Sequence, residues 1–350
     1  MLDRETLLKI ISGQRRGFFP WLVRCALCAA AQVYRLAIFF RNRNFDNGTN
    51  VTRVEVPVIS IGNLTTGGTG KSPMVIWLAA YLRQQEIRVA VLSRGYGVAS
   101  NQASDESLEF QQRLRDVPHL QNPDRVASAK IAIEELEMQA LVLDDAFQHR
   151  KIARDLDVVL IDCTQPFGFG HLLPRGLLRE PLGSLRRSDL IVLTRCNRIT
   201  DLELAKLEQT IGKFTSAPVV KTRTSATHLQ QSSGEIVPLD SLASKKVFAF
   251  AGIGNHQNFW ESLQSLDYQI QDKLAFPDHH NYTRADIVRI GDAASLASAE
   301  AIVCTHKDLV KVTADQVNQI PVYALIVNVE IVAGEQKLKA AVDRVVADTD

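Results

Sequence analysis

The chain has 350 residues, of which 46% are hydrophobic and 23% are charged, enough for an ordered globular protein of two domains. Its 40 lysines and arginines balance 39 aspartates and glutamates, so no net field argues for a nucleic acid partner. The five cysteines are scattered and odd in number, which is typical of a reducing compartment.

The first predicted element is a long helix over residues 18–40, which is almost wholly apolar apart from Arg24, Gln32 and Arg35. The two arginines are eleven residues apart, so they share one side of the helix. A membrane span would place both arginines in hydrocarbon, and a secretory signal would lack them. We therefore expect a helix lying in the headgroup plane with its arginines toward anionic lipid. A core helix of a soluble domain and a span or targeting segment are the alternatives.

A glycine-rich loop at residues 62–73 follows the apolar run at 56–61. Its glycines allow the backbone to wrap around an anion with the N–H groups pointing inward. The positive end of the helix that begins near Lys71 adds to this field. In such loops the lysine reaches the β- and γ-phosphates, and the Ser72 hydroxyl holds Mg²⁺. We therefore predict binding of ATP or GTP by Thr65, Thr66, Gly67, Gly68, Thr69, Gly70, Lys71 and Ser72, which we call the phosphate loop.

The phosphate loop departs from the usual pattern at one position. Thr65 stands where the full consensus has its first glycine, so the match covers only residues 67–72. The alternative is a glycine-rich turn followed by a chance Lys-Ser pair. The order of strand, loop and helix favours the nucleotide interpretation.

Apolar, β-branched runs alternate with helix-like stretches after this loop, which is typical of a parallel sheet. Polar residues such as Asp162 and Thr194 follow several runs, where functional groups of such sheets lie. The pair Asp144-Asp145 ends one run, and carboxylates beside a phosphate loop complete Mg²⁺ sites. An aspartate that merely caps the next helix is the alternative. The runs are residues 89–92, 141–143, 158–161 and 190–193.

The composition turns polar around residues 222–245, which indicates a junction between domains. A second series of apolar runs and helical patterns follows, as in a smaller α/β domain. We therefore expect a membrane-associated amphipathic helix at residues 1–44, a P-loop domain at 45–222 and a smaller α/β domain at 223–350.

Three polar segments gain interest only in the context of kinase chemistry. Asp105-Glu106 is expected in a loop, and residues 278–280 read Asp-His-His. Phosphate transfer to a hydroxyl needs a base, which a histidine supported by an aspartate can supply. The basic stretch around residues 178–187 could clamp a phosphate through its arginines. Ordinary solvated loops and surface charge are the alternatives for these segments.

Together these segments resemble the tetraacyldisaccharide 4'-kinase family of lipid A biosynthesis. The resemblance implies a P-loop NTPase-like α/β/α domain with a parallel sheet, joined to a smaller α/β/α domain and preceded by a membrane-surface helix. Its motifs occur in family order at residues 60–73, 93–97, 144–149, 178–181, 251–255 and 278–280.

The resemblance also implies an activity and a location. The reaction is transfer of the γ-phosphate of ATP, with Mg²⁺, to the 4'-hydroxyl of tetraacyldisaccharide 1-phosphate. The implied location is the cytoplasmic face of the inner membrane of a Gram-negative bacterium, where the protein is peripheral.

Site roles carry over from the family motif by motif. Lys71 and Ser72 hold phosphate and metal, and Asp144 or Asp145 completes the metal site. Asp105 paired with His279 activates the hydroxyl, although His280 is adjacent. The residues implied to line the cleft are Tyr96, Arg179 and Glu180.

The sequence departs from the family pattern in a few places. Ser72 replaces a threonine, Ala146 replaces a glycine, and His306 replaces the glutamate of a Thr-Glu-Lys-Asp motif, so His306 receives no role. Two other classes of protein remain as alternatives. A membrane-associated switch ATPase of the deviant P-loop type would place a lysine where Thr66 stands, and a non-catalytic nucleotide-binding scaffold would leave the acidic pair idle.

Overall fold

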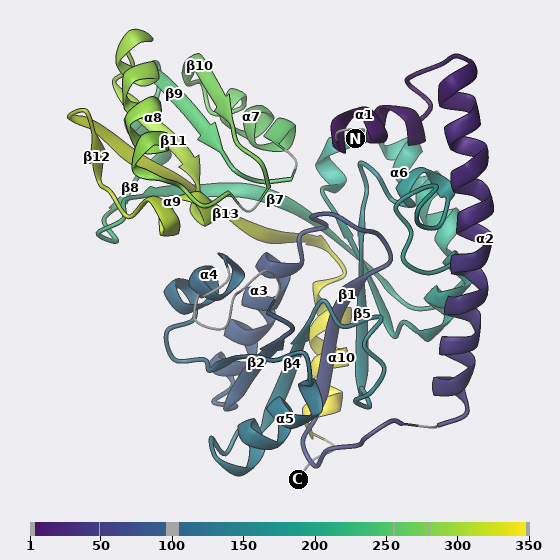
Figure 1. The fold of residues 1–350 in the computed structure, drawn as a ribbon. Helices are drawn as coiled ribbons and strands as arrows, with labels where there is room; N and C mark the ends of the chain where they lie inside the picture. The colour runs from purple at the N-terminus through teal and green to yellow at the C-terminus, as the bar shows by residue number, and fades with distance from the viewer. Residues whose placement is uncertain (1–3, 49, 96–104, 255, 279, 348–350) are drawn as a thin grey trace. The chain divides into compact units, whose positions relative to one another are not determined.

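The computed structural model describes residues 4–48, 50–95, 105–254, 256–278 and 280–347. The chain forms two compact units (Figure 1). The first unit comprises Met1–Gly95, Asp116–Arg223 and Ile331–Asp350, and the second comprises Tyr96–Arg115 and Thr224–Glu330. The strands β7 (Val219–Gln230) and β13 (Ile320–Ala333) contribute to both units.

The first unit is built on a parallel sheet with the strand order β7-β6-β5-β1-β4-β2-β3. The strands β1, β4, β5 and β6 are buried along their whole length. Parallel strands covered on both faces need apolar side chains in both directions, which explains the continuous apolar runs in the sequence. The strands are β1 (Val58–Asn63), β2 (Val89–Ser93), β3 (His119–Gln121), β4 (Ala140–Asp144), β5 (Leu156–Asp162) and β6 (Leu190–Thr194).

The helix α3 follows β1 through the phosphate loop and packs against β1, β2 and β4. Met74, Val75 and Leu78 are among the side chains that α3 buries. The predicted P-loop α/β fold is thereby confirmed for this unit. Its helices are α1 (Arg4–Ile11), α2 (Phe18–Asp46), α3 (Lys71–Gln84), α5 (Arg125–Glu134), α6 (Asp201–Ile211) and α10 (Glu335–Ala347), with 3₁₀ turns η1 (Gly168–Gly170), η2 (Leu182–Arg187) and η3 (Cys196–Arg198).

The predicted helix at residues 18–40 forms the major part of α2, which lies along one side of the first unit (Figure 1). By length and hydropathy α2 is apolar enough to cross a membrane, yet only 11% of its most apolar window is buried. A core helix of a soluble domain would bury its apolar face, so that alternative is wrong. Large exposed side chains along α2 are Phe18, Phe19, Trp21, Leu22, Val33, Leu36, Phe39 and Phe40.

Arg24 of α2 bonds backbone carbonyls of the protein, so the expectation that it faces lipid was wrong, whereas Arg35 is exposed and its orientation toward lipid stays a prediction. The Arg24 Nη1 atom donates to the carbonyl oxygens of Arg15 (3.1 Å) and Ile10 (3.4 Å), and Arg35 lines a cavity beneath the helix. Ile10 is in the last turn of α1, where carbonyls lack partners within the helix, and Arg15 follows that helix, so both carbonyls can accept from a guanidinium. The aromatic side of α2 is consequently the side left exposed.

The second unit contains a sheet with the order β10-β9-β11-β13-β7, in which β9, β10, β11 and β13 run parallel. The helix α4 begins at Asp105, so the loop expected there was wrong; acidic residues suit the first turn of a helix. The elements of this unit are α4 (Asp105–Arg113), β8 (Ile236–Val237), η4 (Leu239–Leu242), β9 (Lys246–Ala251), α7 (His256–Gln264), β10 (Gln269–Ala275), α8 (Arg284–Leu296), β11 (Ala301–Thr305), α9 (His306–Val312) and β12 (Gln316–Val317).

Candidate active site

The phosphate loop connects β1 to α3 and leaves space for a ligand. Gly67 has φ 117° and Gly70 has φ 87°, which are left-handed conformations that side chains disfavour. A Cβ atom added to Gly67 or Gly68 would meet nothing within 4 Å. Gly70 is the N-cap of α3 and has no side chain to satisfy the first N–H groups of the helix. These N–H groups therefore remain available to an anion.

Residues at the ends of β1, β5 and β6 hold the loop in this shape. The Asn63 Nδ2 atom donates to Thr69 Oγ1 at 2.9 Å, and Thr194 Oγ1 donates to the Thr69 carbonyl at 3.0 Å. Arg195 donates to the Gly68 carbonyl at 3.0 Å and pairs with Asp162. The sequence marked positions 162 and 194 as polar strand ends, but it gave Asn63 no role and did not indicate that these residues support the loop.

Asp145 lies between two cations beside the loop. Its Oδ1 atom is 3.6 Å from Lys71 Nζ, and both its oxygens accept from Arg179 Nη1, at 2.8 and 2.9 Å. Burial opposes ionisation of this carboxyl, but the charges of Lys71 and Arg179 outweigh it and hold the pKa of Asp145 below its ordinary value. Asp145 also has φ 48°, a conformation that costs about 1 kcal/mol outside glycine. The structure thus brings Lys71, Asp145 and Arg179 into one charged cluster.

The oxygen groups expected to bind Mg²⁺ lie at adjoining elements of the same unit. Ser72 is in the first turn of α3 and Asp144 ends β4, where it pairs in register with Ile61 of β1. Both residues are buried. Hydroxyl and carboxylate oxygens are suitable Mg²⁺ ligands. Within the described ranges no group of three or more histidine, cysteine, aspartate or glutamate residues could hold a metal, so Mg²⁺ here would also need water or phosphate oxygens.

Glu180, next to Arg179, is an expected substrate residue whose side chain is 0% exposed. Its carboxylate accepts hydrogen bonds from Arg41, Asn42 and Arg187. The sequence gave no sign of this burial, since its two partners on α2 are more than a hundred residues away along the chain.

The remaining expected residues belong to the second unit or lie outside the described residues. Tyr96 and His279 are outside them, and Asp105 is described only as the first residue of α4, without its side chain. The neighbouring His280 Nε2 atom lies 3.1 Å from Asp286 Oδ2, and Lys311 Nζ donates to the His280 carbonyl at 2.8 Å. His280 is therefore already engaged with α8 and α9.

Asp308 organises the turns around His280. Its Oδ1 atom accepts from the Gly252 N–H at 3.0 Å and from the Tyr282 hydroxyl at 2.8 Å, and Thr305 Oγ1 donates to Oδ2 at 2.6 Å. Burial raises the pKa of Asp308, although these three donors oppose the effect. Gly252, in the family motif at residues 251–255, and Tyr282, two residues after the motif at 278–280, thus meet at one buried carboxylate.

Comparison with known proteins gives the family. The family model described as tetraacyldisaccharide-1-P 4'-kinase matches residues 23–347. A tetraacyldisaccharide 4'-kinase from Geobacter sulfurreducens is 34% identical over 96% of this chain and 98% of its own length. One from Desulfatibacillum aliphaticivorans is 37% identical over 93% of each chain.

A solved structure agrees with these relatives. The "apo" form of LpxK from Aquifex aeolicus, in complex with ATP, superposes with a TM-score of 0.74 at 32% identity. The match covers 92% of this chain and 99% of that one. The matching family model and these relatives show that the chain belongs to the tetraacyldisaccharide-1-phosphate 4'-kinase family.

Proposed function

We propose that the protein transfers the γ-phosphate of ATP to the 4'-hydroxyl of tetraacyldisaccharide 1-phosphate, a lipid A precursor. The observation that carries this proposal is the cluster of Lys71, Asp145 and Arg179 beside an open phosphate loop, in a chain of this kinase family. Family membership favours the kinase over a switch ATPase or a non-catalytic scaffold. The division at residues 1–44, 45–222 and 223–350 is part of the same proposal.

In this proposal the N–H groups of residues 65–72 bind the β- and γ-phosphates, and Lys71 reaches them from the start of α3. Both Lys71 and Arg179 neutralise the charge of Asp145. When phosphate binds, the same cations are positioned to stabilise the charge that develops on the transferred group. Catalysis then consists mainly of positioning and charge stabilisation.

Mg²⁺ bound by Ser72, Asp144 and Asp145 would supply further charge neutralisation on the phosphates. We assign activation of the acceptor hydroxyl to Asp105 and His279 and substrate contact to Tyr96 and Arg179. These assignments rest on the family motifs. If Asp105 and His279 act as a unit, Asp105→Ala and His279→Ala each lower kcat, and the double variant adds little further loss. Strictly multiplicative losses would contradict a pair.

We also propose that α2 holds the enzyme peripherally at the cytoplasmic face of the inner membrane. Its exposed aromatic side chains, such as Phe18 and Phe40, are 76% and 60% accessible, which suits insertion into the interface of a bilayer. The acyl chains of the substrate resist transfer to water by about 0.8 kcal/mol per methylene. An enzyme held at the headgroups avoids that cost.

Incubation of the purified protein with Mg²⁺, [γ-³²P]ATP and tetraacyldisaccharide 1-phosphate in detergent micelles tests the proposal. We expect labelled lipid, and no labelled lipid when the added disaccharide already carries a 4'-phosphate. Release of inorganic phosphate without labelled lipid would instead indicate an ATPase and refute the assignment.

A further inference from the structure

The carboxylate of Glu180 is removed from solvent and held from two sides. Two of its donors belong to α2: Arg41 Nη2 is 3.1 Å from Oε1, and Asn42 Nδ2 is 3.0 Å from Oε2. The third, Arg187 Nη2 in η2, lies 2.8 Å from Oε2. A buried carboxylate is costly unless donors replace its lost hydration. The hydrogen bonds from Arg41 and Asn42 to this carboxylate consequently stabilise the position of the end of α2.

The segment around Glu180 is joined to the phosphate loop as well as to α2. The backbone N–H of Arg179 donates to the Leu64 carbonyl at 2.7 Å, and the Thr66 N–H donates to the Leu177 carbonyl at 2.8 Å. The Arg179 carbonyl accepts from the Tyr34 hydroxyl of α2 at 3.0 Å. The Arg179 guanidinium meanwhile bonds Asp145. Residues 177–180 therefore connect α2 to the charged cluster.

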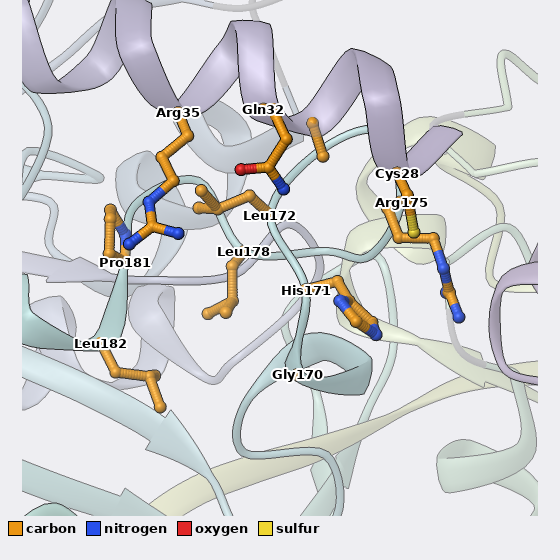
Figure 2. Close-up of a pocket in the computed structure, with 11 residues that line it drawn as sticks. Cys28, Gln32, Arg35, Gly170, His171, Leu172, Arg175, Leu178, Pro181 and Leu182 are labelled. Carbon is orange, nitrogen blue, oxygen red and sulfur yellow. The ribbon is translucent and has the colours of Figure 1, made fainter. Parts of the chain in front are cut away.

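Apolar packing alone does not hold the middle and the C-terminal half of α2 against the rest of the unit. The buried side chains of α2 are Pro20, Ala31 and Ile38. A cavity of about 250 Å³ separates the middle of the helix from the segment after η1. Figure 2 shows Gln32 and Arg35 of α2 above this cavity, with Leu172 and Leu178 on its opposite wall. The hydrogen bonds from Tyr34, Arg41 and Asn42 thus contribute much of the attachment here. Arg150 adds bonds to the Asn42 carbonyl at 3.1 Å and to Asp46 at 2.7 Å.

We propose that Arg41 and Asn42 are positioning residues for phosphate transfer: by holding the buried carboxylate of Glu180, they set Arg179 against Asp145. This inference rests on the proposed kinase function. In this proposal α2 has a second role besides membrane attachment, because the position of its C-terminal half determines the position of the Arg179 guanidinium. In this proposal Glu180 connects α2 to Arg179 of the charged cluster and does not bind the substrate.

The matched pair Arg41→Ala and Arg43→Ala tests the proposal. Both variants remove one arginine from the same stretch of α2, so they weaken attraction to anionic lipid alike, but Arg43 is exposed and only Arg41 bonds Glu180. We expect Arg41→Ala to lower kcat about tenfold or more through misplacement of Arg179, with KM for ATP nearly unchanged. Arg43→Ala keeps the wild-type kcat. Arg41→Lys, which retains a donor, recovers part of the loss.

A double variant shows whether Arg41 acts through Arg179. In an Arg179→Ala background, adding Arg41→Ala is expected to change kcat less than twofold, because the group to be positioned is already absent. Flotation with vesicles of phosphatidylethanolamine and phosphatidylglycerol checks that both single variants bind membranes equally. Multiplicative losses in the double variant, or equal kcat for Arg41→Ala and Arg43→Ala, would overturn the inference while wild-type kinase activity stands. Failure of the wild-type protein to label the lipid would instead reject the proposed function.

Discussion

Replacing Lys71 by alanine separates the chemical role of this lysine from its part in folding. In the folded protein Lys71 Nζ lies 3.6 Å from Asp145 Oδ1. Removal of one partner of a buried ion pair is severe when it leaves an uncompensated charge. Asp145 keeps both its contacts with Arg179, at 2.8 and 2.9 Å. We therefore expect Lys71→Ala to cost about 1 kcal/mol of stability, which lowers Tm by a few degrees.

The effect of Lys71→Ala on phosphate transfer is expected to be much larger. The lysine is the first residue of α3, whose N-terminus has no side-chain cap, so its charge adds to the positive field of the helix N-terminus. Loss of one such preorganised group typically lowers kcat by about 10²- to 10³-fold. Initial rates of lipid labelling at saturating ATP measure this loss, and thermal unfolding measures the stability.

Lys130→Ala provides the control, because Lys130 is an exposed lysine on α5 of the same unit. It is expected to leave both kcat and Tm unchanged. Turnover of Lys71→Ala within threefold of wild type would refute the phosphate role. A collapse of Tm by more than ten degrees would refute the reasoning that Arg179 compensates Asp145.

Three further predictions concern stability and membrane binding. Burial lowers the pKa of His306 from 6.5 to about 4. Between these values the unfolded chain binds more protons than the folded protein, so the free energy of unfolding falls as the pH drops through them. His306→Gln is expected to reduce the fall in the free energy of unfolding between pH 7 and 4.5 by about 2 kcal/mol, measured by urea unfolding. A Cβ atom on Gly62 would lie 2.5 Å from the Phe147 nitrogen, so Gly62→Ala is expected to lower stability by about 2 kcal/mol, measured by thermal unfolding. Replacing both Phe39 and Phe40 of α2 with serine is expected to weaken vesicle binding by about 3 kcal/mol, measured by flotation.

The glycine and vesicle-binding predictions have matched control variants. Gly183→Ala adds the same atom where nothing lies within 4 Å, and it should leave Tm unchanged; an equal loss in both glycine variants would contradict the steric argument. Leu202→Ser alters an exposed apolar side chain on α6 and should not affect vesicle binding. An unchanged pH dependence after His306→Gln would show that other groups carry the acid sensitivity.

The phosphate loop and the central strands could be predicted because their signals are local. The spacing of Gly67, Gly70 and Lys71 encodes a backbone path, and uninterrupted apolar runs encode strands buried on both faces. The groups that support the loop could not be predicted in the same way. Thr194 and Arg195 reach Thr69 and Gly68 only through the register of neighbouring parallel strands, which no short stretch of sequence specifies.

The orientation of α2 shows a similar limit. Helical periodicity predicts that Arg24 and Arg35 share a side, but it cannot say whether that side meets lipid or protein. The carbonyls that bind Arg24 come from α1 and from the turn after it, and two of the three partners of Glu180 come from the far end of α2. Periodicity therefore predicts that the arginines lie toward the headgroups, but at least one of them, Arg24, donates to backbone carbonyls of the protein.

The second unit is built from two segments that are far apart in the chain, which has a consequence for its biosynthesis. Its helix α4 comes from Tyr96–Arg115, but the rest of the unit begins only at Thr224, more than a hundred residues later. Phe110 is buried, and Arg113 bonds the Val327 carbonyl. Val327 is made 214 residues after Arg113, so at about 5–20 residues per second α4 waits roughly 10 to 40 seconds for this partner. A nascent chain stalled before Thr224 would display an unburied aromatic side chain to chaperones, and a fragment expressed from Thr224 onward would lack the helix that covers α9.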